Sequence, residues 1–379
     1  MANGTVYALK EEPLAVAERE FAVLRRLETA SLPAVSVVGL AASPERDSAI
    51  LVTEYLAYSI QYRRLLMRFP TGPGPYRDRL LDAMAWLLVD LHRSGVFWGD
   101  CSLANTLFRR DGDKIQAFLV DAETSEIHPS LSDGQRRYDL DILVENVAFG
   151  LADLAALQER PEGIDDAIEA AETVRARYDD LWDEISSEPE LSPDDRHAVR
   201  ARIRRLNELG FAVDEIELDP TTGGEGTVRL RVAVANRRFH VRQLERLTGL
   251  VALEGQARLL LNDLTEYRAW IEYHESRPMS ELEGAERWLH DVLEPALASL
   301  VPVIGLQRDP LQAYCDVLEE KWILSEMAGG DVGLEAAKDA FIGLGAPAPE
   351  VPEDGVDSSI VLDIDWSNGL DQPSPDRTG

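Results

Sequence analysis

The amino-acid sequence predicts an α+β protein in which a small mixed lobe, a mainly helical lobe and a further mixed region follow one another along 379 residues. Three observations lead to this prediction. Short β-branched runs flank one helical pattern before residue 57, helical periodicity dominates residues 58–209, and two strand patterns precede several helices after residue 210. A 45% apolar composition is enough to supply cores for such domains.

The first lobe is predicted from a strand, a helix and two further strands. VYALKEE is a short apolar strand, and AVAEREFAVLRRLETA places Val16, Phe21, Leu24 and Leu27 along one side of a helix. VSVVGL and SAILVTEYL are β-branched runs separated by the loop AASPERD, which is typical of neighbouring strands. Residues 1–57 are therefore expected to form a small α/β lobe.

A buried helix and a polar loop open the second lobe, which we expect to cover residues 58–209. From Tyr76 to Ser94 apolar residues recur every three or four positions, and Gly95 supplies the helix stop. GVFWGDCSLANTLFRRDGDKIQAFLVDAE is predicted to form a loop, a short strand, a DGD turn and a second strand. An acidic helical stretch then runs from about Arg137 to Leu209.

The third region is expected to form a mostly helical α+β domain over residues 210–345. FAVDEIELD and VRLRVAVA predict two strands joined by PTTGGEGT. We interpret this glycine-rich piece as a hairpin turn, because Glu225 within it would repel a phosphate group. From Ala346 the chain is acidic and rich in proline, so residues 346–379 are expected to form a disordered tail.

Charge and cysteine content argue against several classes of protein. A net charge of −31 and a pI near 4.5 disfavour non-specific attraction to nucleic acid or to anionic membranes. Cys101 and Cys315 lie far apart and form no CxxC motif, which excludes a disulfide framework and a four-cysteine metal site. Because neither a signal peptide nor a run of eighteen apolar residues is present, we expect a cytoplasmic protein without a membrane span.

The stretch FWGDCSLANTLF and the strand end after it carry residues suited to phosphoryl transfer from ATP. Such a reaction needs a carboxylate that orients the attacking hydroxyl, oxygen ligands for Mg²⁺ and a cation for the α/β phosphates. Asp100 is a candidate for the first role, and Asn105, five residues on, is a neutral Mg²⁺ ligand that can face the same cleft. Asp121, at the end of FLVDAE, would be a carboxylate ligand of the same metal.

At these residues the sequence resembles the protein-kinase-like superfamily, nearest to its lipopolysaccharide-kinase and small-molecule-kinase branches. In that superfamily a Leu-His-x-x-Gly helix end precedes the catalytic loop, as LHRSG does here at residues 91–95. The resemblance implies that Asp100 is the catalytic-loop Asp and that Asn105 is the metal-binding Asn. Asp121 corresponds to the Asp of the metal-binding triplet, which has the sequence DAE in place of DFG.

The resemblance also implies a nucleotide-binding lobe around Lys10, one of only four lysines in the chain. Lys10 in VYALK corresponds to the lysine that pairs with the α/β phosphates, and Glu20 to the helix Glu that holds it, with Glu18 as the nearby alternative. Nine residues precede Lys10, too few for the two strands and glycine-rich loop that cover the phosphates. We therefore expect a truncated N-terminal lobe without that loop, which implies either a truncated chain or weak nucleotide binding.

Two further segments match the superfamily pattern. LVTEYL resembles the strand that leads to the hinge, which implies Thr53 as gatekeeper and the backbones of Glu54 and Leu56 as hydrogen-bond partners of adenine. YDLDIL resembles the start of the helix whose Asp braces the catalytic loop, a structural role that falls to Asp139. Trp98 and Gly99 stand where that loop usually carries other bracing groups, so we do not expect control by activation-loop phosphorylation.

A narrower resemblance is to bacterial kinase-like proteins that join this core to a C-terminal domain of unknown function. It rests on FWGDCSLANTLFRRDG, VDAETSEIHPSLSDGQRRYDLDI and LTGLVALEGQARLLLNDLTEYRAW. This narrower resemblance implies a fold and not a substrate. The broader resemblance to kinases implies transfer of the ATP γ-phosphate to a hydroxyl of a saccharide, a metabolite or a protein, with ATP and Mg²⁺ as cofactors. The alternative is a pseudokinase scaffold whose C-terminal domain binds a protein or phosphorylated partner.

An arginine-rich stretch supports that second class of function. Between residues 226 and 248 a single acid, Glu245, accompanies six arginines: Arg229, Arg231, Arg237, Arg238, Arg242 and Arg246. They would either bind a phosphorylated or nucleic-acid partner or pair with the surplus carboxylates of the chain itself. No helix-turn-helix, RRM or zinc pattern accompanies them, so a nucleic-acid partner is not expected.

Overall fold

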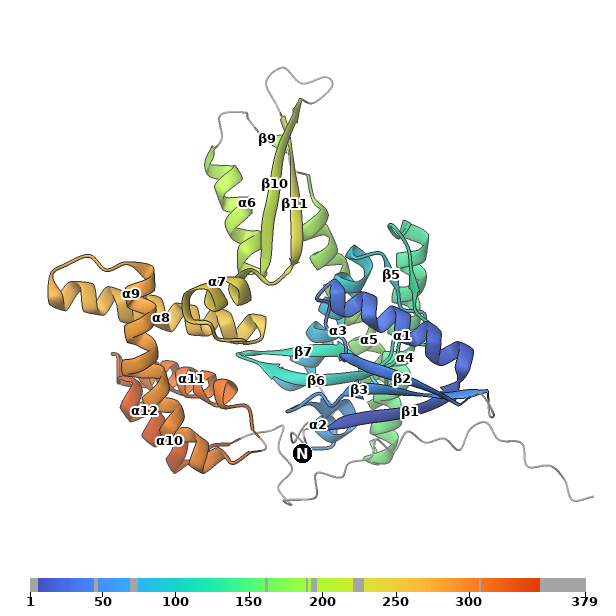
Figure 1. Cartoon of the computed structure of the whole chain (residues 1–379), viewed down its shortest axis with the longest axis horizontal. Helices are drawn as coiled ribbons and strands as arrows, with labels where there is room; N and C mark the ends of the chain where they lie inside the picture. Colours follow the sequence, from blue (N-terminus) through green and yellow to red (C-terminus); the bar gives the residue numbers. More distant parts are fainter. Residues whose placement is uncertain are drawn as a thin grey trace, which may run out of the picture.

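The computed structural model of the chain describes residues 6–43, 47–68, 74–160, 163–188, 190–191, 196–220, 228–306 and 308–347. These residues form a small lobe, a larger helical lobe and a C-terminal helical region (Figure 1). The predicted α+β class is therefore correct. The turn expected at PTTGGEGT and the acidic tail beyond residue 347 lie outside the described residues.

The small lobe is a three-stranded antiparallel sheet with one helix against it. Its elements are β1 (Tyr7–Pro13), α1 (Leu14–Thr29), β2 (Val37–Ser43) and β3 (Ser48–Glu54). The strand order is β1-β3-β2, and the register places Lys10 opposite Leu51. Leu24 and Leu27 of α1 are fully buried, as the helical spacing of the apolar residues predicts.

The larger lobe holds three long helices and short strands. Its elements are β4 (Ile60–Gln61), α2 (Tyr62–Arg68), α3 (Pro75–Arg93), β5 (Val96–Phe97), β6 (Thr106–Asp111), β7 (Lys114–Leu119), β8 (Glu126–Ile127), α4 (Asp133–Leu157) and α5 (Gly163–Ser186). The next elements, β9 (Glu190–Leu191) and α6 (Arg196–Glu208), lead to the C-terminal region, where Leu191 and Glu190 of β9 pair with Val228 and Arg229. Helix α3 begins with Pro75 in its first turn and is buried over most of its length, as the dense apolar pattern predicts. The Ser132 hydroxyl and the Gln135 side chain form a capping box at the start of α4.

The two lobes share one hydrophobic core, which extends from Val23 in α1 to Phe211. They also share main-chain hydrogen bonds, because Leu119 at the end of β7 donates to Pro33 and accepts from Val35, with N···O distances of 3.0 Å. The end of β7 is thereby fixed against the segment that follows α1.

The C-terminal region begins with a long hairpin and continues as helices with a second core. Its elements are β10 (Phe211–Pro220), β11 (Val228–Arg237), α7 (Phe239–Thr248), α8 (Glu254–Glu275), α9 (Glu281–Trp288), the π-helix η1 (Leu289–Leu293), α10 (Glu294–Ile304), α11 (Pro310–Ala328) and α12 (Leu334–Gly343). Trp288 and Tyr314 are fully buried in that core. Figure 1 shows α8–α12 at the end of the molecule opposite the β1-β3-β2 sheet. No helix in the described ranges has the length and apolar character needed to cross a bilayer.

The predicted DGD turn between β6 and β7 docks into the C-terminal region. Gly112 donates its N–H to Oε1 of Gln312 (2.8 Å) and accepts from Nε2 of the same side chain (2.9 Å). The buried Asp111 accepts from the N–H of Gln256 at 2.8 Å. A Cβ on Gly255 would lie 2.3 Å from the Asp111 carbonyl oxygen, so the two backbones approach too closely for any other residue. This turn is both a hairpin end and a contact between the two cores.

Candidate active site

Asp100 and Asn105 lie in one loop between β5 and β6, and their side chains are in contact. Asn105 donates from Nδ2 to Oδ2 of Asp100 at 2.8 Å and to the Asp100 carbonyl oxygen at 3.2 Å. Asn146 of α4 donates from Nδ2 to Oδ1 of Asp100 at 3.5 Å and to the Cys101 carbonyl oxygen at 2.9 Å. The exposed Asp100 carboxylate is thus oriented by two amides and faces solvent.

Asp139 of α4 holds the start of this loop. Its buried carboxylate accepts from the N–H groups of Trp98 (2.7 Å) and Gly99 (2.8 Å), from Sγ of Cys101 (3.1 Å) and from Nε2 of His92 (3.0 Å). Burial by itself raises the pKa of Asp139, but these hydrogen bonds outweigh it, so the net shift of the pKa is downward. The predicted bracing role of Asp139 is confirmed.

His92 links Asp139 to Tyr178 of α5. An ionised Asp139 can only accept, so Nε2 of His92 carries the proton, and Nδ1 accepts from the Tyr178 hydroxyl at 2.7 Å. Burial lowers the pKa of His92, which keeps the ring neutral. Cys101 is fully buried, and burial raises the pKa of its thiol well above the usual range. It therefore fills space beside the loop and is not a nucleophile.

A second group gathers around Lys10 of β1. Its ammonium lies 3.1 Å from Oε2 of Glu20 and 3.2 Å from Oδ1 of Asp121. Two further carboxylates approach it, Glu12 at 2.5 Å and Glu123 at 3.7 Å. Glu20 of α1 is fully buried and also accepts the N–H of Ala122 at 3.0 Å, whereas Glu18 is exposed. Of the two glutamates considered, the structure brings Glu20 to Lys10.

The electrostatics of this group are unbalanced. Burial by itself lowers the pKa of Lys10, but the surrounding carboxylates outweigh it and raise the pKa above its usual value. Burial raises the pKa of Glu20 to about 7, although the Ala122 N–H and Lys10 both favour its ionised form. Four carboxylates thus surround one ammonium, and a further cation would offset their excess negative charge.

The two groups meet at the base of the β6–β7 hairpin. Thr106 of β6 is paired with Leu119 of β7, and the Val120 N–H donates to the Asn105 carbonyl oxygen at 3.2 Å. Trp98 donates from Nε1 to the Asp121 carbonyl oxygen at 3.3 Å. Asn105, just before β6, and Asp121, two residues after the end of β7, are therefore brought to the same end of the hairpin although sixteen positions separate them in the sequence.

The residues predicted to form the hinge lie along β3 and just beyond it. Thr53 is paired with Ala8 of β1, two positions from Lys10. The Glu54 N–H is donated to the Ser36 carbonyl oxygen (2.8 Å), and the Leu56 carbonyl accepts from the Ser59 hydroxyl (2.8 Å). Among the described side-chain contacts, none joins Thr53, Glu54 or Leu56 to Lys10. Their role toward adenine stays a prediction.

Three residues of the site escaped the sequence reasoning, and each carries a local signal. Glu12 follows Lys10 by two positions, which places both on the same face of β1. Glu123 is the third residue of the DAE triplet. Asn146 lies seven positions after Asp139, which places both on one face of α4 two turns apart. Neither the two-residue spacing in β1 nor the seven-residue spacing in α4 identifies a site by itself, because the neighbouring strand or loop supplies the rest of it.

Comparison with known proteins bears on the part of the chain that holds Lys10, Asp100, Asp121 and Asp139. A model of the "Lipopolysaccharide kinase (Kdo/WaaP) family" matches residues 6–160. This segment is a domain of that family. The resemblance of its catalytic-loop motifs to lipopolysaccharide kinases is thereby confirmed. A second model, "Domain of unknown function (DUF4032)", matches residues 180–344, so the expected C-terminal domain of unknown function is also present.

Individual relatives of the kinase-family domain are distant. The "Lipopolysaccharide core heptose(I) kinase WaaP" of Pseudomonas aeruginosa is 26% identical over 137 residues, which cover 34% of this chain and 51% of that protein. The chain therefore spans about half the length of this curated relative. A solved structure, "WaaP in complex with acyl carrier protein", shares 22% identity with a TM-score of 0.32 and covers 48% of this chain and 83% of that one.

Proposed function

We propose that the chain is an ATP- and Mg²⁺-dependent phosphotransferase that moves the γ-phosphoryl group of ATP to a hydroxyl of an acceptor. The observation that carries the proposal is the ammonium of Lys10 held between Glu20 and Asp121, 3.1 and 3.2 Å away. A kinase-like fold that transfers a phosphoryl group from ATP needs a lysine held in this way beside a carboxylate that binds the metal.

The donor set fits a Mg²⁺ ion that phosphate oxygens complete. Asn105 uses its Nδ2 on Asp100, which leaves its Oδ1 to act as one ligand atom, and the Asp121 carboxylate would supply the other. In the described ranges no group of three His, Cys, Asp or Glu side chains is arranged to hold a metal ion. Mg²⁺ is usually held by one or two protein oxygens together with phosphate and water, so this sparse set suffices. Bound Mg²⁺ would supply charge neutralisation on the phosphates.

In this proposal Asp100 receives the proton of the acceptor. Its exposed carboxylate accepts from Asn105 and Asn146, which hold it in one orientation without neutralising it. A hydroxyl bound there would donate its proton to Asp100 as its oxygen forms the new bond to the γ-phosphorus. The bond from that phosphorus to the β–γ bridging oxygen breaks, and ADP leaves. Lys10 would hold the α/β phosphates throughout.

We propose a saccharide hydroxyl as the first acceptor class to test. The Pseudomonas aeruginosa relative is named as a heptose kinase, and the family model that matches this chain is that of lipopolysaccharide kinases. A metabolite or protein hydroxyl would use the same groups, because Asp100 would contact only the acceptor's hydroxyl and its two amides contact Asp100 itself. The choice of acceptor therefore depends on surfaces outside this group of residues.

The test is Mg²⁺-dependent binding of ATP, followed by ADP formation with and without saccharide acceptors. Wild type is expected to gain thermal stability with ATP only when Mg²⁺ is present. Asp121→Ala is expected to lose this gain, whereas Asp100→Asn is expected to keep it and lose turnover. Asp141→Ala, an exposed change on α4, is the control and should match wild type. If wild type shows no Mg²⁺-dependent response up to millimolar ATP, the proposal fails and the pseudokinase scaffold takes its place.

A further inference from the structure

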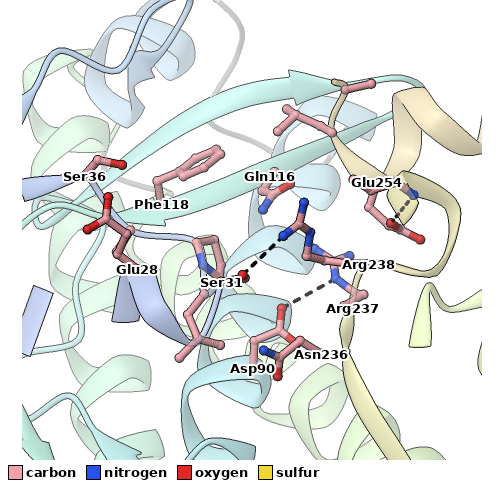
Figure 2. Close-up of a pocket in the computed structure, with 16 residues that line it drawn as sticks. Glu28, Ser31, Ser36, Asp90, Gln116, Phe118, Asn236, Arg237, Arg238 and Glu254 are labelled. Carbon is pink, nitrogen blue, oxygen red and sulfur yellow. Dashed lines mark hydrogen bonds and ion pairs between the residues drawn. The ribbon is translucent and has the colours of Figure 1, made fainter. Parts of the chain in front are cut away.

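A cavity lies where the kinase-family domain meets the C-terminal region, away from the Lys10 group. It has a volume of about 300 Å³ and is lined by the end of α1 and the loop after it, by α3 and β7, and by residues 236–241 and 252–254 (Figure 2). This volume lies at the lower end of the range for small-molecule sites. The cavity is therefore large enough for a small organic molecule.

The carboxylates that line this cavity already have partners. Asp90 lies 3.5 Å from Nε of Arg237, and both side chains are largely buried. Glu254 accepts from two backbone N–H groups at the start of α7, at 2.9 and 3.1 Å. Glu28 is paired with Arg25 at 3.0 Å. Each of these three carboxylates therefore already has a cation or a backbone N–H group as its partner.

Arg238 is different, because its charge is not matched. Its Nη1 donates to the Ser31 hydroxyl at 3.2 Å, and Figure 2 shows its guanidinium reaching into the middle of the cavity near Gln116. No carboxylate of the described residues pairs with it. A hydroxyl satisfies one of five guanidinium donors and carries no charge. The chain has a net charge of −31, so an arginine in a cavity without a carboxylate partner is a local positive charge that would favour an anionic ligand.

The rest of the lining combines neutral donors with apolar surface. Gln116 contributes an amide and Ser31 a hydroxyl on the side of Arg238. Leu32, Phe118 and Val241 are largely buried and form apolar wall. A guanidinium flanked by neutral donors binds carboxylate or phosphate oxygens, and the apolar wall adds affinity for a hydrocarbon or aromatic body.

We propose that this cavity is a binding site for a small organic anion, a carboxylate or phosphate on an apolar body, with Arg238 as the recognition residue. The ligand would contact the end of α1 and β7 from the kinase-family domain and α7 from the C-terminal region. One molecule would then bridge the two domains. This site is separate from the proposed nucleotide site, and its existence does not depend on that function.

The test is calorimetric titration of the full chain with benzoate and phenyl phosphate, each repeated with saturating Mg²⁺ and ATP. Wild type is expected to bind at least one of them, with or without nucleotide, and to bind inorganic phosphate more weakly because it lacks the apolar body. Arg238→Gln is expected to weaken binding at least about tenfold, because one charge-assisted hydrogen bond is lost. Arg242→Gln, an exposed arginine one turn along α7, should leave binding unchanged.

Gln116→Phe supplies a second variant, because it fills the cavity without changing its charge and is expected to abolish binding of both anions. The proposal is overturned if neither anion binds wild type at millimolar concentration. It is also overturned if Gln116→Phe binds as wild type does, if folded Arg238→Gln does so, or if neutral benzyl alcohol binds as tightly as benzoate.

Discussion

Replacing Asp139 with Asn is expected to loosen the loop that carries Asp100. One carboxylate oxygen of Asp139 accepts from Trp98 and His92, and the other from Gly99 and Cys101. An amide nitrogen in place of the second oxygen would face the Gly99 N–H and leave it unpaired, which costs about 1–3 kcal/mol. The remaining bonds also lose the strength that a charged acceptor gives them, so the total is about 3–5 kcal/mol.

Urea unfolding and hydrogen exchange measure this change. Asp139→Asn should lower the unfolding midpoint and speed amide exchange in residues 97–101 by about 100-fold or more, since each 1.4 kcal/mol is a factor of ten. The matched control is Asp141→Asn on the same helix, where an exposed pair with Arg175 at 2.8 Å contributes at most about 1 kcal/mol. Equal effects of the two substitutions on stability and exchange would refute the bracing argument.

Two further predictions concern the domain contact and the buried glutamate. Gly255→Ala should lower the midpoint of thermal unfolding although alanine favours helices, because its Cβ would lie 2.3 Å from the Asp111 carbonyl oxygen. The control is Gly343→Ala, where an added Cβ meets no atom within 4 Å, so this substitution should be neutral or stabilising in the same assay. The pKa of Glu20 is raised from 4.5 to about 7, so its contribution to stability is present below pH 4.5 and is lost as the pH rises through 7. The unfolding free energy of wild type relative to Glu20→Gln should therefore fall by about 3 kcal/mol across this range, and a flat difference would contradict the buried environment assigned to Glu20.

Local sequence determined most of the elements and much of the candidate site. The helix spacing of Leu24 and Leu27 and the β-branched runs beside them predicted the small lobe, because burial of one face follows directly from periodicity. Asp100 and Asn105 sit five positions apart in one loop, so their contact needed only a local turn. The domain boundaries and the chemical roles of the site residues stay predictions.

Tertiary structure alone decided how distant segments meet. The spacing of Lys10 and Glu12 places both on one face of β1, and the kinase resemblance pairs Glu20 with Lys10. Neither indicates that Asp121 and Glu123 also reach this ammonium, because that depends on where β7 ends against the small lobe. The sequence likewise does not show which arginine of the arginine-rich stretch lacks a carboxylate partner among the described residues. That depends on which carboxylates of other elements already have partners, as Asp90 has in Arg237. The periodicity of apolar residues indicates which face of a helix or strand is buried. Which charged side chains pair depends instead on how elements far apart in the chain pack together.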